Sequence, residues 1–210
     1  MIHLLSGEQP TIVIDVTASE STLPLLCQAA ESGCGIVLAN KRPLCAEQST
    51  WHVLTEAGNA RYEATVGAGL PVISTLQYLL ATGDQVLCIE GALSGTLGYL
   101  FSRMEAGDAF STILASAHKQ GYTEPDPRDD LGGMDVARKA LILARTIGLT
   151  LELSDIAFQP LYPSEMTALS VADFLDQAVT LDEEHRAQQA KAASEGKVWR
   201  RRYGSVFSRR

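Results

Sequence analysis

The chain has 210 residues, of which 46% are hydrophobic, and a formal net charge of -8 at pH 7. This length and composition allow a buried core in one or two domains. The acidic balance argues against a general nucleic-acid-binding protein, which is usually basic, and no apolar run is long enough to span a bilayer.

The cysteines and the first residues bear on the cellular compartment. Cys27, Cys34, Cys45 and Cys88 show no CxxC pair and no metal-ligand spacing, which predicts reduced thiols in the core of a cytoplasmic protein. Residues 1–7 lack the basic region and the apolar stretch of a signal peptide. We therefore expect a cytoplasmic protein.

The first predicted elements are two strands and the helix between them. Residues 11–16 (TIVIDV) form an apolar run rich in β-branched side chains, which is typical of a buried parallel strand. Ser19 or Ser21 can cap the next helix, which tolerates Pro24 because this proline falls near its first turn. The run at 36–39 predicts a second buried strand.

The carboxyl end of this second strand carries Asn40 and Lys41, where open α/β sheets bind their ligands. A helix over roughly 46–57 then leads to a strand near 60–65. This alternation predicts half of a doubly wound dinucleotide-binding domain over residues 1–65. The GxGxxG turn that would hold a pyrophosphate at a helix N-terminus does not occur in the 210 residues. The expected domain is therefore partial, and its first strand has an open edge.

Beyond residue 66 the pattern changes, and we assign 66–197 to a second domain and 198–210, with its five arginines, to a basic irregular tail. The expected elements are a helix over 70–80, a strand over 85–93, a helix opening at Ser94, a helix near 109–120, a helix ending near Thr146, an extended strand over 156–163 and a polar helix over 181–196.

Residues 121–139 (GYTEPDPRDDLGGMDVARK) join a carboxylate-rich loop to the start of a helix. Two prolines predict that the loop is extended and stiff, and apolar residues recur at spacings of three and four from Met134 onward. Asp135 and Lys139 are four residues apart and so share one face of the helix. Taken alone, these features fit equally well a solvated loop with an ordinary surface ion pair.

The stretch 121–139 resembles the signature of homoserine dehydrogenases, and other segments agree with it in the same order. These segments are 15–19 (DVTAS), 39–43 (ANKRP), 62–71 (YEATVGAGLP) and 91–101 (GALSGTLGYLF). The similarity runs from about residue 11 to about residue 197, close to the version fused to aspartate kinase. It implies an α/β fold, a partial Rossmann-type domain followed by an α+β substrate-binding and dimerisation domain, and a chain truncated at both ends relative to the family.

The resemblance implies an oxidoreductase that interconverts L-aspartate 4-semialdehyde and L-homoserine with NADP or NAD, in threonine and methionine biosynthesis. The alternative is a truncated, catalytically silent fragment that folds and self-associates, as a homodimer, through its substrate domain. The missing GxGxxG favours the alternative for the isolated chain, whereas the site residues favour the enzyme. Neither hypothesis needs nucleic acid or a membrane as a partner.

The resemblance also assigns roles to two lysines and a threonine. Lys139 matches the acid/base lysine of the family, Lys41 matches a second lysine at the cofactor and substrate, and Thr17 matches a cofactor contact. An ammonium can donate a proton to the oxygen that becomes an alkoxide, and a neutral amine can remove it in the reverse direction. The alternative is that Lys139 is a surface lysine paired with Asp135 and that Lys41 is a solvent-facing loop lysine.

The acidic residues fall into two further groups. Glu124 and Asp135 match substrate-binding acids, and Asp129 is the further candidate, while Asp126 and Asp130 are expected to shape the loop. A monovalent, sodium-type cation site is implied at Glu63, Val66, Ala68 and Leu70. One carboxylate plus backbone carbonyls suits a hard cation, although the glycines there could also form a hinge between the domains.

Overall fold

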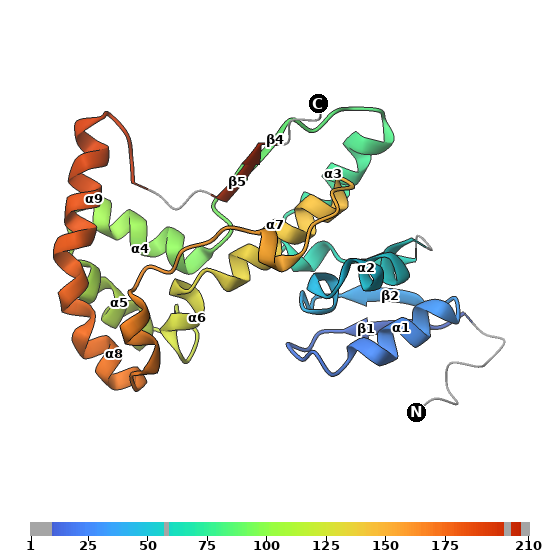
Figure 1. The fold of residues 1–210 in the computed structure, drawn as a ribbon, viewed down its shortest axis with the longest axis horizontal. Helices are drawn as coiled ribbons and strands as arrows, with labels where there is room; N and C mark the ends of the chain where they lie inside the picture. Colours follow the sequence, from blue (N-terminus) through green and yellow to red (C-terminus); the bar gives the residue numbers. More distant parts are fainter. Residues whose placement is uncertain (1–9, 57–58, 200–202, 207–210) are drawn as a thin grey trace. The chain divides into compact units, whose positions relative to one another are not determined.

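The structure, a computed structural model, describes residues 10–56, 59–199 and 203–206. These residues divide into two compact units (Figure 1). The first lies within 1–89, 137–157 and 206–210, and the second within 90–136 and 158–205. The expectation for residues 1–7 and that for most of the tail, 200–202 and 207–210, lie outside the described residues.

The first unit is built on a three-stranded parallel sheet in the order β1-β2-β3. The strands are β1 (Ile12–Asp15), β2 (Gly35–Leu38) and β3 (Ala60–Arg61). All three were predicted, but β3 is shorter than the expected 60–65 because the chain turns into a 3-10 helix, η3 (Glu63–Thr65).

The two faces of this sheet differ in exposure. In the parallel register Ile12 lies opposite Gly35 and Ile14 opposite Val37, so their side chains share one face. On that face Ile12 is 65% and Ile14 64% exposed, whereas Ile36 on the other face is 1% exposed. The prediction that residues 11–16 are buried is therefore wrong for this face, although their parallel pairing is confirmed.

Two helices explain the covered face, because α1 (Leu23–Glu31) and α2 (Gln48–Thr55) bury their apolar side chains in the same unit. Pro24 lies in the first turn of α1, as predicted. The predicted caps at Ser19 or Ser21 are wrong. Thr22 takes the N-cap position without a side-chain capping bond, because its hydroxyl donates to Asp15 instead.

The boundary between the units differs from the one expected at residues 65 and 66. The helix α3 (Val72–Ala81) falls in the first unit, where Ile73 and Leu76 are buried. The last ten residues of α7 (Met134–Thr146) also fall in the first unit. The functional names of the two domains stay predictions.

The helix α7 follows the predicted spacing, since Ala137, Leu141 and Ala144 are fully buried. Its second half is buried on further sides as well, at Ile142 and Arg145. This helix is therefore part of the core of the protein rather than a surface helix.

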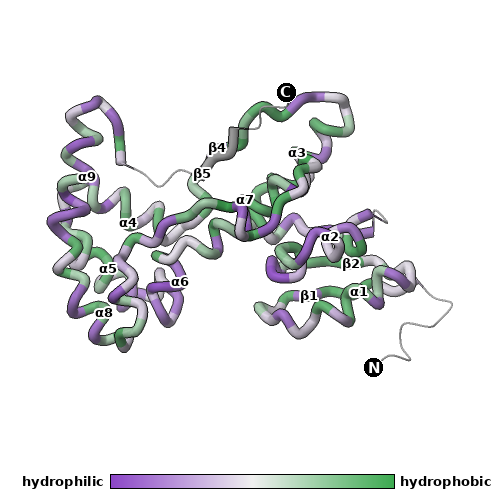
Figure 2. Tube along the Cα trace, in the orientation of Figure 1, coloured by the Kyte–Doolittle hydropathy of each residue, from purple (hydrophilic) through white to green (hydrophobic). Residues whose placement is uncertain are grey.

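The second unit is mainly helical. Its helices are α4 (Gly95–Glu105), α5 (Phe110–Lys119), α6 (Pro127–Leu131), η5 (Ser164–Ala168), α8 (Val171–Gln177), η6 (Ala178–Leu181) and α9 (Asp182–Ser194). Ser94 caps α4, as its hydroxyl accepts the Leu97 N–H at 3.2 Å. The core is one cluster around Leu100, Leu114 and Phe174. The tube of α9 is hydrophilic over much of its length in Figure 2, which agrees with the predicted polar helix.

Three expectations for the second half of the chain are wrong in part. Residues 156–163 form no strand, since Pro160 and Pro163 supply no N–H for a ladder. The signature loop is not extended throughout, because it contains α6. The tail includes a strand, β5 (Tyr203–Val206), which pairs with β4 (Cys88–Gly91) in a two-stranded sheet.

The four cysteines are free, as expected, but only Cys34 is a core residue. Cys27 and Cys45 are half-buried and Cys88 is exposed, because Cys88 lies on β4, whose side chains are at most half-buried. No helix in the described part of the chain is both long and apolar enough to cross a bilayer.

Candidate functional site

A polar network joins the carboxyl ends of β1 and β2. Asp15, the last residue of β1, is 4% exposed, and Asn40, which follows β2, is 3% exposed. The Asn40 side-chain amide donates to Asp15 Oδ2 at 3.0 Å and to the Ser19 carbonyl at 2.7 Å. Neighbouring parallel strands end at the same edge of a sheet, which brings these two residues together from 25 positions apart.

The carboxylate of Asp15 also holds the turn that follows its own strand. Oδ1 accepts the Thr17 N–H at 2.9 Å, and Oδ2 accepts the Thr22 hydroxyl at 2.8 Å. Burial raises the pKa of Asp15, but these hydrogen bonds and that from Asn40 outweigh it and leave the pKa below its ordinary value. Asp15 is therefore an anion that fixes the loop.

Two of the predicted site residues, Thr17 and Lys41, lie directly beside this network. Thr17 is exposed, with its hydroxyl 3.4 Å from Asn40 Nδ2, and Lys41 is half-buried directly after Asn40. The Asn40 Oδ1 atom accepts the Arg42 N–H at 3.1 Å, which fixes the backbone on the far side of Lys41. Thr17 and Lys41 are thus brought to one edge of the sheet, where ligands of open α/β sheets bind.

A buried arginine fixes the turn that follows Lys41. The Arg145 guanidinium donates to the carbonyls of Leu44 at 2.8 Å and Ala46 at 2.7 Å, and it pairs with Glu152 at 2.9 Å. The Arg145 side chain is fully buried. It therefore anchors the segment around the 3-10 helix η2 (Pro43–Cys45) to α7.

The sequence interpretation missed the roles of Asp15, Asn40 and Arg145. The sequence carries a signal for the first two residues. Asp15 is the polar residue near the end of the apolar run 11–16, and Asn40 directly follows the apolar run 36–39. For the anchoring of η2 by Arg145 no local signal exists, since Leu44 and Ala46, whose carbonyls it binds, are 101 and 99 positions away in the chain.

The predicted cation-binding segment, 63–70, comprises η3 and the turn that leads to α3. Glu63 Oε1 accepts the Ile73 N–H at 2.7 Å and Oε2 accepts the Ser74 N–H at 2.8 Å. Desolvation raises the pKa of Glu63, but the hydrogen bonds that it accepts at the start of α3 lower the pKa by more. The pKa of Glu63 therefore lies below its ordinary value. Glu63 therefore accepts hydrogen bonds from two N–H groups in the first turn of α3, which have no carbonyl partner within the helix.

The backbone of this segment is tightly curved. Gly67 has φ +87° and Ala68 has φ +53°, so both lie in the left-handed region. A Cβ at Gly67 would stand 2.6 Å from Val72 Cγ2, which excludes larger residues there. Val66 is buried, and the Leu70 carbonyl accepts the Val72 N–H at 2.8 Å. Among the described residues, no group of three His, Cys, Asp or Glu side chains could hold a metal.

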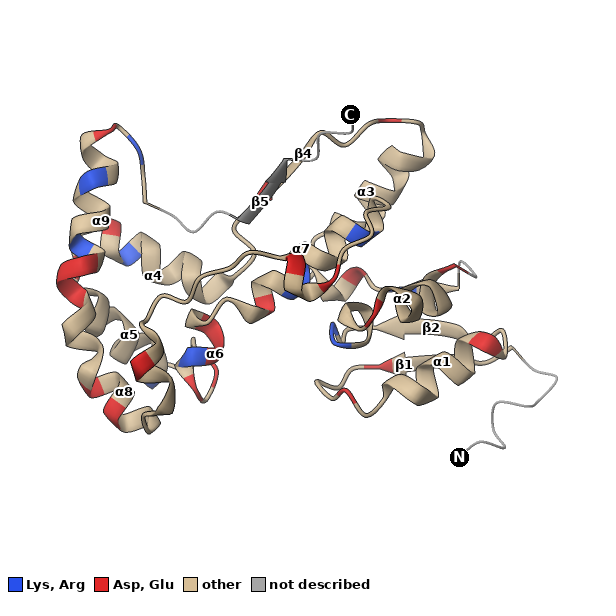
Figure 3. Cartoon of the chain, viewed as in Figure 1, with Lys and Arg blue, Asp and Glu red and all other residues tan. Residues whose placement is uncertain are grey.

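The carboxylates of the signature loop divide into two kinds. Asp126 caps α6 by accepting the Arg128 N–H at 2.9 Å, and Asp130 accepts the Glu124 N–H at 2.8 Å. Both are used for loop architecture, as predicted. Glu124 and Asp129 are exposed, so their carboxylates are accessible to a ligand. Acidic residues cluster around α6 in Figure 3.

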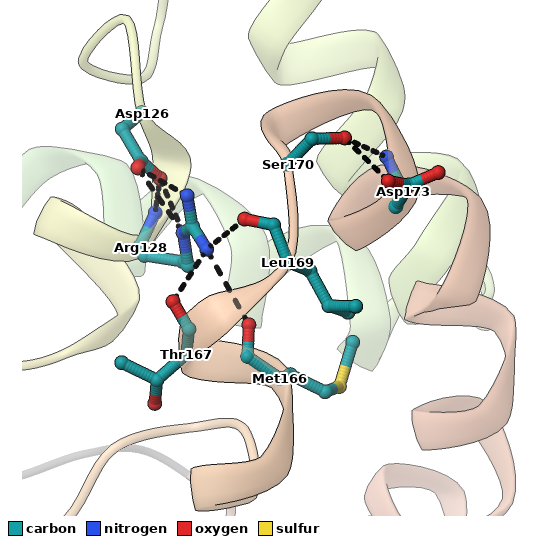
Figure 4. A network of polar contacts seen from close by, with 7 residues as sticks. All are labelled: Asp126, Arg128, Met166, Thr167, Leu169, Ser170 and Asp173. Atoms are coloured by element: carbon teal, nitrogen blue, oxygen red, sulfur yellow. Dashed lines mark hydrogen bonds and ion pairs between the residues drawn. The ribbon is translucent and has the colours of Figure 1, made fainter.

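Arg128 ties this loop to the segment at 164–169 (Figure 4). Its guanidinium forms a bidentate pair with Asp126, from Nε to Oδ1 and from Nη2 to Oδ2, and donates to the carbonyls of Thr167 at 2.8 Å and Leu169 at 2.7 Å. These hydrogen bonds from Arg128 hold the pKa of Asp126 below its ordinary value. The planar guanidinium thus provides hydrogen-bond donors for the carbonyls of Thr167 and Leu169 at the end of η5, where a helix leaves its last carbonyls without partners.

The remaining predicted site residues lie on α7. Asp135 is in its first turn and Lys139 is four residues later, so the two share one helix face. Both are half-buried. Thr17, Lys41, Glu63 and Lys139 belong to the first unit, whereas Glu124, Asp129 and Asp135 belong to the second.

Comparison with known proteins identifies relatives over most of the chain. The family profile described as Homoserine dehydrogenase matches residues 71–204. A maize chloroplastic protein, bifunctional aspartokinase/homoserine dehydrogenase 2, is 44% identical over 90% of this chain and 21% of its own length. The homoserine dehydrogenase of Saccharomyces cerevisiae is 39% identical over 94% of this chain and 58% of its own length.

A solved structure shares the fold. It is a hyperthermophilic archaeal homoserine dehydrogenase in complex with NADPH, with a TM-score of 0.61 and 25% identity over 69% of this chain and 46% of its own. The present chain thus spans between about a fifth and three fifths of the length of these proteins.

Proposed function

Because the chain belongs to the homoserine dehydrogenase family, we propose that it serves the reversible NADP- or NAD-dependent interconversion of L-aspartate 4-semialdehyde and L-homoserine. The reaction would place it in threonine and methionine biosynthesis. The reduction consumes one hydride and one proton and converts the aldehyde to a primary alcohol.

The observation that carries the proposal is that the carboxylates of the signature loop have two different environments. Asp126 and Asp130 accept hydrogen bonds from backbone N–H groups within the loop, while the side chains of Glu124 and Asp129 are exposed. A loop stiffened in this way can hold free carboxylates in fixed positions, which favours binding of an ammonium group. The substrate has an α-ammonium and an α-carboxylate, so it requires such an acid.

The nicotinamide cofactor would supply or accept the hydride. The residues present fit one part of its site, because the exposed Thr17 and the backbone fixed by Asn40 lie at the carboxyl ends of parallel strands. Thr17 and Lys41 are the residues that would contact it. A phosphate-binding GxGxxG turn is not among the 210 residues.

Lys139 is proposed as the acid and base. Its ammonium would donate a proton to the carbonyl oxygen during reduction, and its neutral amine would remove the hydroxyl proton during oxidation. Lys41 would hold the substrate carboxylate or polarise the carbonyl. Asp135 would orient the substrate from the same face of α7 as Lys139.

The segment at 63–70 is proposed to bind a monovalent cation. The fit is partial, since each Glu63 oxygen already accepts one N–H but has a further lone pair. Gly67 and Ala68, both in the left-handed region, curve the backbone between Val66 and Leu70. Val66, Ala68 and Leu70 would supply backbone carbonyls.

The second candidate is a catalytically silent fragment that self-associates as a homodimer. The exposed face of the sheet at Ile12 and Ile14 lies in the first unit, so it favours self-association through that unit rather than through the substrate domain expected from the sequence, because parallel sheets are normally covered on both faces. A cytoplasmic location belongs to both proposals.

The test uses the purified chain with aspartate semialdehyde and NADPH, and with homoserine and NADP. Turnover that Lys139→Ala abolishes supports the enzyme. Homoserine binding that Glu124→Gln weakens, without turnover, supports the silent fragment. A chain that neither binds homoserine nor turns over contradicts the proposed substrate.

A further inference from the structure

A cavity in the first unit lies beside the turn that follows β2. Its volume is about 260 Å³. The residues that line it include Glu20, Leu23, Arg42, Cys45, Arg138 and Leu153. None of them has been assigned to the reaction proposed above.

Two arginines and one glutamate are among the residues that line this cavity. Arg42 Nη1 pairs with Glu20 Oε1 at 2.5 Å. Arg138 contributes its carbonyl to the Cys45 thiol at 3.6 Å, but in the part of the chain that the structure describes its guanidinium has no acid partner. The three charges leave the cavity with one net positive charge in a chain of net charge -8.

The cavity also has an apolar part, because Leu23 and Leu153 are among its lining residues. The charged side chains beside it keep much of their hydration, since Arg42 is 38% and Glu20 73% exposed. The attraction for an anion is therefore that of a partly exposed site rather than of a buried one. Arginine is also suited to oxyanions, because its planar fork matches a carboxylate or a phosphate with two parallel hydrogen bonds.

The size of the cavity restricts the ligand. Sites for drug-sized ligands usually have volumes of about 300–1,000 Å³, and the present cavity is slightly smaller. It therefore suits a small ion or a small metabolite rather than a whole dinucleotide.

We propose that this cavity is a binding site for a small oxyanion, of carboxylate or phosphate type, that Arg138 holds with Arg42 as the second donor. Glu20 competes with the ligand for Arg42, so the site takes an anion more weakly while that ion pair is intact. The proposal does not depend on turnover or on the nicotinamide cofactor.

The test titrates inorganic phosphate, and separately acetate, into the 210-residue chain by calorimetry without cofactor or substrate. Arg138→Gln should weaken binding at least about ten-fold, the effect of losing a charge-assisted hydrogen bond. The Glu20→Gln substitution should instead increase the affinity for the anion, because it removes the carboxylate that pairs with Arg42. Arg103→Gln is the matched control, since Arg103 pairs with Asp108 in the second unit, and it should change nothing.

The two probes separate the ligand classes, as preference for phosphate or for acetate identifies the anion type. Binding of neither probe at millimolar concentration overturns the proposal. It is also overturned if Arg138→Gln binds like the parent chain, or if Glu20→Gln weakens binding. Should Arg138→Gln fail to fold, the sign of the Glu20→Gln effect alone decides.

Discussion

The side-chain amide of Asn40 donates to the carboxylate of Asp15 at 3.0 Å and so ties the end of β2 to the end of β1. Both side chains are almost completely buried. The bond joins the two loops that carry Thr17 and Lys41, and the stability of this edge of the sheet therefore depends on it.

Asn40→Ala should lower the free energy of unfolding by about 1–3 kcal/mol, because it leaves a buried carboxylate with fewer donors. Urea unfolding measures the effect. Gln188→Ala, on the exposed surface of α9, is the control and should stay within about 0.5 kcal/mol of the parent. An Asn40→Ala chain as stable as this control would show that the network is not stabilising.

The pKa of Asp15 predicts how stability depends on pH. Its folded pKa lies below the ordinary value of 3.8, so the unfolded state binds the proton more readily and stability rises with pH. This contribution is complete above the unfolded pKa and is lost as pH falls through the folded pKa. The stability difference between the parent chain and Asp15→Asn should therefore shrink as pH falls from 7 to below 3.8. A difference that stays constant over this range would contradict the assignment.

Glu63→Ala should destabilise the chain by about 1 kcal/mol, the usual effect of removing a helix cap, because Ile73 and Ser74 lose their acceptor. Glu63→Gln should retain part of this stability, since one amide oxygen can still accept. If the segment also binds sodium, both variants should lose the stabilisation that added sodium gives the parent chain, measured against potassium and choline. Equal melting of all three proteins would contradict the capping role.

Lys139→Ala should lower turnover by roughly 10²- to 10⁴-fold with little change in cofactor affinity, the range for losing a positioned proton donor. Lys139→Arg should not restore it, because a guanidinium stays protonated. The rates are measured in a chimera in which this chain replaces the matching part of the yeast relative. Lys119→Ala, at the exposed end of α5, is the control. Retention of more than about a tenth of parent turnover would contradict the acid/base role and make Lys41 the better candidate.

The purified chain should bind NADP and NAD weakly or not at all, because its sequence has no GxGxxG turn to hold the pyrophosphate. Isothermal titration measures this directly. A low-micromolar dissociation constant for either dinucleotide would show that other residues of the chain suffice for the phosphates.

The sequence by itself determined the features that depend on neighbours within a few residues. The spacing of Ala137, Leu141 and Ala144 predicted the buried face of α7. Pro24 predicted the first turn of α1, because a proline fixes φ and lacks an N–H. Local sterics and helical periodicity are encoded within a single segment, so they can be read without knowledge of the fold.

Only the tertiary structure decided which partners distant residues meet. The exposure of Ile12 and Ile14 depends on whether a layer covers that face of the sheet, and their apolar character could not reveal it. Arg145 lies in an ordinary helical position, yet it anchors Leu44, 101 residues away. Hydrogen bonds and burial across such separations follow from the packing of whole elements, and local periodicity carries no record of that packing.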